Sequence, residues 1–119
     1  MAITEFGKAI RKARIDINAT MVSMADDLGV SVAFLSSLEN GRKKISDDWV
    51  KKIENFFLKN NKEIKNLKAL AEISNKVVPI DNLSFEQQML ISHFAKTRLT
   101  SKDLKKFADI INSLNKEND

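Results

Sequence analysis

The 119-residue chain contains no cysteine, one proline and three glycines. The absence of cysteine excludes disulfide bonds and cysteine-ligated zinc, and it suits a reducing cytoplasm. Because proline and glycine are the main helix breakers, their scarcity predicts long helices and few tight turns. No apolar run approaches the roughly 20 residues of a membrane-spanning helix, and the opening MAITEFGKAIRK has no signal-peptide core. We therefore expect a helical, cytoplasmic protein that does not enter a membrane.

Groups that support catalysis or bind cofactors are also scarce. His93 is the only histidine, and one histidine without cysteine cannot form an ordinary zinc site. The sequence has no glycine-rich phosphate loop and no nucleophile with an adjacent base. The pairs Asp26-Asp27 and Asp47-Asp48 are consecutive residues, which point in different directions on a helix. We expect no enzymatic activity, no metal and no cofactor.

The charge of the chain is informative locally rather than in total. Its apolar fraction of 43% is typical of a globular protein, and its formal net charge is +4. Residues 1–58 carry nine basic and eight acidic side chains, and residues 59–119 carry eleven and eight. The stronger indications of nucleic-acid binding are two local clusters of basic residues, Arg42-Lys43-Lys44 and the group Lys8, Arg11 and Lys12.

Residues 20–41, TMVSMADDLGVSVAFLSSLENG, are the most informative segment. Apolar residues recur at i, i+3, i+4 and i+7 in residues 21–28, which is typical of one helix face. Gly29 can adopt the left-handed conformation that ends a helix, and Ser31 can cap a second helix over residues 32–40. Two short helices joined by a tight turn predict a helix-turn-helix motif, whose second helix fits the major groove of DNA.

The same segment resembles the lambda-repressor-like (Xre-type) DNA-binding domains. The residues that carry this resemblance are Leu28-Gly29-Val30-Ser31 and Leu38-Glu39-Asn40-Gly41-Arg42. Upstream, residues 6–14 are similar to the first helix of that family, and residues 45–53 resemble the helix that packs behind the motif. The resemblance covers roughly residues 3–58. It implies a sequence-specific, double-stranded DNA-binding transcriptional regulator, a repressor of the kind found on phages and other mobile elements.

Helical periodicity predicts an all-α chain of seven helices. Besides the two motif helices, these cover about residues 4–17, 47–58, 62–75, 85–99 and 101–114. Proline disfavours helix at the residue before it, so Val77–Asn82, with Pro79, predicts a linker. We therefore expect a five-helix lambda-repressor-like domain at residues 1–75, a linker at 76–83 and a C-terminal helical hairpin at 84–115.

The resemblance also implies which residues contact DNA. Base contacts would come from the start of the second motif helix, at Ser31, Val32, Ala33, Ser36 and Ser37. Phosphate contacts would come from the start of the first motif helix and from the segment after the second, at Thr20, Asn40, Arg42, Lys43 and Lys44. Apolar residues contact only thymine methyl groups and serines form single hydrogen bonds, so we expect modest direct readout and a larger contribution from DNA shape. The alternative is that Val32 belongs to the core and the serines are only solvated.

In similar domains an arginine late in the first helix pairs with the glutamate of the Glu-Asn-Gly turn. The resemblance therefore implies that Arg14 and Glu39 form a structural ion pair and are not available to DNA.

The C-terminal half carries apolar residues that need a partner surface. The expected inner faces of its two helices consist of Phe85, Met89, Phe94, Leu99, Leu104, Phe107, Ile111 and Leu114. The hairpin would form a homodimer, or it would close the core of one seven-helix monomer. A second functional hypothesis is an antitoxin or sequestering protein whose C-terminal half binds a toxin or a metallopeptidase. A third, weaker hypothesis is binding to RNA or the ribosome.

Overall fold

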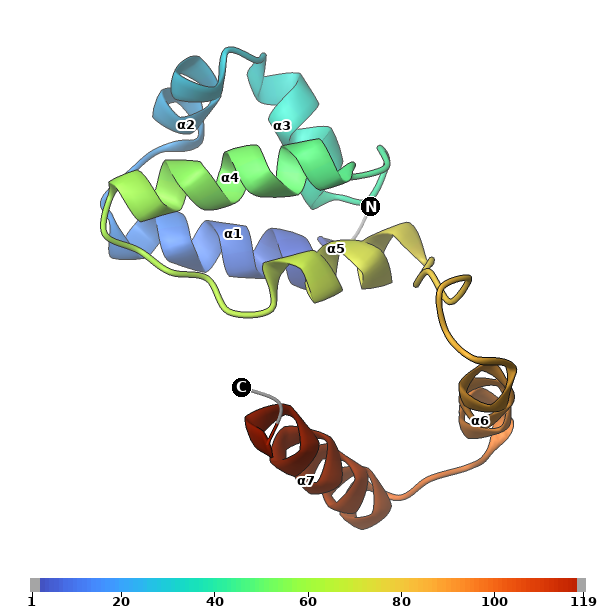
Figure 1. The fold of residues 1–119 in the computed structure, drawn as a ribbon. Coiled ribbons are helices and arrows are strands. Elements are labelled where there is room, and N and C mark those ends of the chain that lie inside the picture. Colours follow the sequence, from blue (N-terminus) through green and yellow to red (C-terminus); the bar gives the residue numbers. More distant parts are fainter. Residues whose placement is uncertain (1–2, 118–119) are drawn as a thin grey trace. The chain divides into compact units, whose positions relative to one another are not determined.

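The computed structural model describes residues 3–117, and all regular secondary structure in this range is helical (Figure 1). This confirms the predicted all-α fold. The chain divides into two compact units, with unit 1 ending at Val78 and unit 2 beginning at Pro79. No single helix in residues 3–117 is long and apolar enough to cross a membrane. Only the bent pair of α2 (Met21–Leu28) and α3 (Val32–Glu39) has the necessary combined length and composition.

Unit 1 contains the first five helices. These are α1 (Glu5–Asp16), α2 (Met21–Leu28), α3 (Val32–Glu39), α4 (Asp47–Lys59) and α5 (Leu67–Asn75). The first four begin after a serine or threonine whose hydroxyl oxygen accepts a hydrogen bond from the backbone N–H three residues later; these caps are Thr4, Thr20, Ser31 and Ser46. Such caps satisfy backbone groups that a helix end leaves without a partner. The helix starts in this region therefore follow from local sequence.

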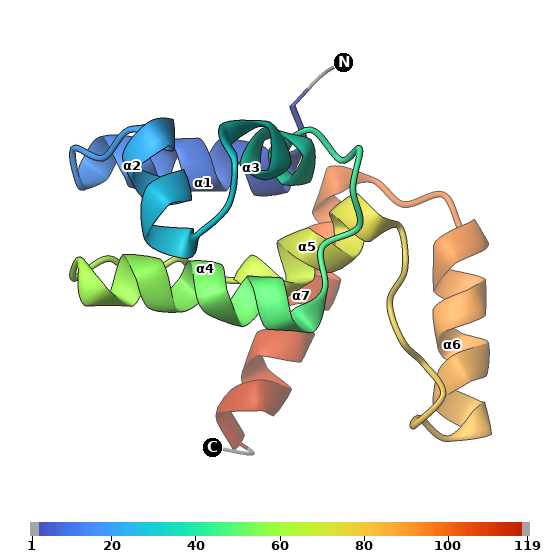
Figure 2. The same cartoon turned by 90° about the horizontal axis from the view of Figure 1, so that it is seen from above.

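The hydrophobic core lies in unit 1. Helix α1 contacts α3 and α5, and α4 contacts α2 and α5, so the two motif helices and α5 each close part of the core (Figure 2). The large side chains that are almost fully buried come from all five helices: Phe6, Ile10, Met24, Leu35, Leu38, Ile53, Phe57 and Leu67. Each contributes roughly 1.5–3 kcal/mol of burial free energy. This core holds the motif on a rigid support.

The fifth helix is shorter than the sequence predicts. Helical periodicity predicted residues 62–75, but α5 begins at Leu67. Asn61 and Asn66 adopt left-handed backbone conformations, with φ of 60° and 61°. A helix cannot continue through such residues, so residues 62–65 between them are not part of α5. Ile64 still packs against the core from the irregular segment.

Unit 2 consists of α6 (Phe85–Lys96) and α7 (Ser101–Glu117). Helix α6 ends three residues before the predicted Leu99, because Thr97 is extended and its hydroxyl donates to the carbonyl oxygen of His93 at 2.6 Å. Helix α7 instead runs beyond its predicted end near residue 114. None of the side chains described in unit 2 is buried.

Candidate nucleic-acid interface

Helices α2 and α3 meet at a sharp turn. Their axes are bent by 105° at the break between them, within the range of about 90–120° that is typical of a helix-turn-helix. Gly29 ends α2 in the left-handed conformation with φ of 72°, and the N–H of Val30 donates to the carbonyl oxygen of Ala25 at 3.0 Å. Ser31 then caps α3. The turn therefore has the geometry that the glycine and the serine predict.

One face of α3 is available to a ligand. Val32 and Ala33 are exposed, and Ser36 and Ser37 lie one turn further along the same face. Val32 is 41% exposed, so the alternative that it belongs to the core is wrong. The inward ridge of α3 is formed by Leu35 and Leu38 instead. The structure therefore brings the predicted base-contacting residues together on one accessible surface.

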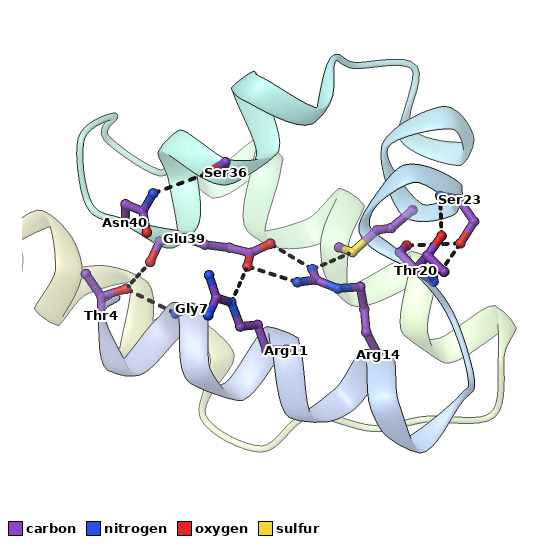
Figure 3. Close-up of polar contacts among 10 residues, drawn as sticks. Thr4, Gly7, Arg11, Arg14, Thr20, Ser23, Ser36, Glu39 and Asn40 are labelled. Carbon is purple, nitrogen blue, oxygen red and sulfur yellow. Dashed lines mark hydrogen bonds and ion pairs between the residues drawn. The ribbon is translucent and has the colours of Figure 1, made fainter. Parts of the chain in front are cut away.

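The three serines of this surface already form internal hydrogen bonds. The Ser31 hydroxyl accepts the N–H of Phe34 at 3.0 Å, and the Ser37 hydroxyl donates to the Phe34 carbonyl oxygen at 2.6 Å. The Ser36 hydroxyl accepts from the side-chain amide of Asn40 at 3.2 Å (Figure 3). A hydroxyl has one donor and two acceptor sites. Ser37 is therefore left as an acceptor, whereas Ser36 retains its donor.

Thr20 is part of a reciprocal cap at the start of α2. The Thr20 hydroxyl accepts the N–H of Ser23, and the Ser23 hydroxyl accepts the N–H of Thr20, both at 3.0 Å (Figure 3). The cap fixes the position of Thr20 and leaves its hydroxyl hydrogen available to an anion. Sequence reasoning missed Ser23, although the spacing Thr-x-x-Ser resembles a capping box.

Residues Arg42, Lys43 and Lys44, which we call the basic segment, follow α3 directly and are exposed. The backbone N–H groups of Arg42 and Lys43 both donate to the carbonyl oxygen of Ser37, at 3.0 and 3.2 Å. The Lys43 ammonium lies 4.9 Å from the centroid of the Phe34 ring. None of the three side chains forms an ion pair within residues 3–117. The basic segment is therefore a surface group of positive charge beside the exposed face of α3.

Arg14 and Glu39 form a buried, bidentate ion pair. The two guanidinium nitrogens of Arg14 donate to the two carboxylate oxygens of Glu39 at 2.7 and 3.0 Å, and the side chains are 7% and 1% exposed (Figure 3). Arg11 is a third member that sequence reasoning missed, since its Nε lies 3.6 Å from the same carboxylate. Thr4 adds a hydrogen bond from its hydroxyl to the Glu39 carbonyl oxygen at 2.9 Å. These contacts join α1 to the end of α3.

The net positive charge of the chain belongs to unit 1. Unit 1 has fourteen basic and ten acidic residues, and unit 2 has six of each. Division at Val78 therefore localises the charge more clearly than the division of the sequence at residue 58 did.

One carboxylate of unit 1 is perturbed: a hydrogen bond from Lys62, 2.8 Å away, lowers the pKa of Asp16 from its ordinary value.

The comparisons with known proteins agree with this geometry. Residues 10–60 match the model of the Helix-turn-helix family, and this segment contains α2, α3 and α4. The match confirms the family resemblance predicted from the residues around Gly29 and the Glu-Asn-Gly turn. A search of curated proteins and a search of solved structures gave no match.

Proposed function

We propose that the protein is a dimeric, sequence-specific repressor of transcription, on the premise that residues 10–60 match the helix-turn-helix family and resemble its lambda-repressor-like domains. In this proposal α3 lies in the major groove and the basic segment contacts the phosphate backbone. The observation that carries the proposal is the exposed face of α3, which has apolar and hydroxyl side chains at its centre and positive charge at its C-terminal end. Such a surface suits apolar contact with thymine methyl groups and flexible hydrogen bonding to base edges.

A charge placed in the centre of this face tests the proposal. Ala33→Glu puts a carboxylate where the proposal places DNA, so we expect duplex binding to be lost. Ala69→Glu is the matched control, because Ala69 is also an exposed helical alanine of unit 1, on α5. Equal duplex affinities of the two variants in fluorescence anisotropy would contradict the placement of α3 in the groove.

Dimerisation is proposed to occur through unit 2. The apolar residues of α6, including Phe85, Met89, Leu90, Ile91 and Phe94, are spread around much of the helix and are all exposed. A helix that is apolar on most sides needs to be buried on most sides, and α7 alone covers only one. Isolated units of roughly 40 residues or fewer usually need disulfides, metals or oligomerisation to be stable, and this chain has no cysteine.

The occupant that we propose is a second copy of unit 2. An open apolar groove of about 500 Å³ lies between α6 and α7. Its lining includes Leu90, Phe94, Leu99, Phe107 and Ile111. Because unit 2 has equal numbers of basic and acidic residues, net charge does not oppose the pairing of two copies. Two helical pairs would together form a four-helix bundle, in which each apolar face is covered.

Sedimentation equilibrium tests this arrangement. We expect the wild-type chain to be a dimer and Phe107→Glu, which places a charge in the groove, to be a monomer. Lys105→Glu is the control, because Lys105 lies on the same helix, is exposed and does not line the groove. A monomeric wild-type protein at concentrations of tens of micromolar would contradict dimerisation through unit 2.

The same apolar face supports a second candidate function. An antitoxin or sequestering protein would use α6 and α7 to cover a different protein, such as a toxin or a metallopeptidase, and DNA binding by unit 1 can coexist with that role. The two candidates differ in their stoichiometry. A monomeric chain that forms a one-to-one complex with such a protein through Phe107 would favour the second.

A further inference from the structure

The last residue of α5 forms a two-point contact with the backbone that follows the basic segment. The side-chain amide oxygen of Asn75 accepts the N–H of Ile45 at 2.8 Å, and its amide nitrogen donates to the carbonyl oxygen of Ile45, also at 2.8 Å. Both backbone groups of Ile45 are therefore satisfied by one side chain that is thirty residues away in sequence. The Ile45 side chain is 2% exposed, so the same residue is also anchored in the core.

The other end of the basic segment is fixed to α3. The carbonyl oxygen of Ser37 accepts the N–H groups of both Arg42 and Lys43. Gly41, directly before them, has φ of 75°, a conformation that glycine adopts without strain. The three basic residues are thus confined between a backbone anchor on α3 and the Asn75 contact from α5.

We infer that Asn75 is a positioning residue for DNA binding, which holds the basic segment in the conformation that contacts phosphates. This inference rests on the function proposed above, and it adds a residue on α5, outside the helix-turn-helix motif. A segment that is already ordered loses less conformational entropy when it binds. Loss of the Asn75 contact would let residues 42–45 fluctuate, and their charges would then contact the backbone of DNA less often.

The salt dependence of binding distinguishes positioning from general destabilisation. Each phosphate contact contributes about 0.9 to the slope of log affinity against log salt concentration. We expect Asn75→Ala to weaken duplex affinity about tenfold at low salt. The slope should fall by the contribution of roughly one to two phosphate contacts. The triple variant Arg42→Ala/Lys43→Ala/Lys44→Ala removes the side chains that Asn75 positions. In that background Asn75→Ala should have no further effect on affinity.

Ser74→Ala is the matched control. Ser74 is the neighbouring residue of α5, and its hydroxyl is buried with no hydrogen-bond partner among the residues that the structure describes. The change to alanine alters helix propensity as Asn75→Ala does, but it breaks no contact to the backbone of Ile45. We expect Ser74→Ala to retain the wild-type affinity and salt slope.

Amide hydrogen exchange tests the contact without DNA. In Asn75→Ala the N–H of Ile45 should exchange faster, while those of Leu35 and Leu38 in α3 should keep their protection. A wild-type salt slope in Asn75→Ala, an equal loss of affinity in the triple-variant background, or unchanged protection of Ile45 would each overturn the inference. If the proposed function itself is wrong, the result differs: the wild-type protein would bind no duplex, whatever the hydrogen-exchange rate of the Ile45 N–H.

Discussion

The buried pair of Arg14 and Glu39 gives the sharpest prediction about stability. Removing one member of a buried ion pair typically costs about 3–5 kcal/mol, because the remaining charge loses its partner without returning to water. The geometry also predicts an order. If Arg14 is removed, Glu39 keeps Arg11, whose Nε lies 3.6 Å away and whose side chain is half exposed. If Glu39 is removed, the remaining polar contact of Arg14 is to the sulfur of Met24 at 3.4 Å.

We therefore expect Arg14→Met to lower the free energy of unfolding by about 3 kcal/mol and Glu39→Met by about 5 kcal/mol. The double variant should lose less than the sum, because the one charge that it leaves without this partner, on Arg11, is half exposed to water. Denaturant titration followed by tryptophan fluorescence is suitable, since Trp49 is the only tryptophan and lies in unit 1. Additive effects, or single effects within about 1 kcal/mol as for a surface pair, would refute the reasoning.

Two further predictions concern α1. Gly7→Ala should lower the free energy of unfolding of unit 1 by about 1–3 kcal/mol in the same titration, because the methyl group would collide with the backbone carbonyl of Glu39. Alanine normally favours helices over glycine, so an increase in stability would contradict this close approach. Lys62→Met should return the pKa of Asp16 towards its ordinary value, measured by NMR titration of the carboxyl carbon. Because this pKa is lowered in the folded protein, the unfolded chain takes up the proton first as the pH falls. The contact between Asp16 and Lys62 therefore stabilises the folded protein fully above about pH 3.8, the ordinary pKa of the carboxyl group, and this contribution is lost as the pH falls below it. In Lys62→Met the free energy of unfolding should not show this part of the decrease.

The motif was predictable from sequence because its signals are local. Gly29 ends α2, Ser31 caps α3 and Ser46 caps α4, and each acts on residues within one turn of itself. The predicted ranges for these helices accordingly agree with the structure to within a residue or so. The start of α5 was not predictable in this way, because apolar periodicity continues through residues 62–66 while the left-handed conformation of Asn66 is not evident from its neighbours.

Contacts between distant residues were the other part that sequence reasoning missed. Arg11 was placed among the surface bases, yet it approaches Glu39 across twenty-eight positions. Asn75 was not singled out at all, because its partner is the backbone of Ile45, and backbone groups carry no signal in the sequence. The predicted apolar surface of unit 2 included Phe85, Met89 and Phe94 of α6, but the exposed Leu90 and Ile91 extend it further around this helix.

The central claim is that the protein recognises a specific duplex through α3 and the basic segment. Selection of bound duplexes from a random DNA pool, with affinity measured against salt concentration, tests it most directly. The proposal predicts enrichment of an inverted repeat with half-sites about 10 base pairs apart, and a steep salt slope that falls when Arg42, Lys43 and Lys44 are replaced by alanine. Weak binding with no enriched sequence, or stronger retention by structured RNA than by any duplex, would contradict it.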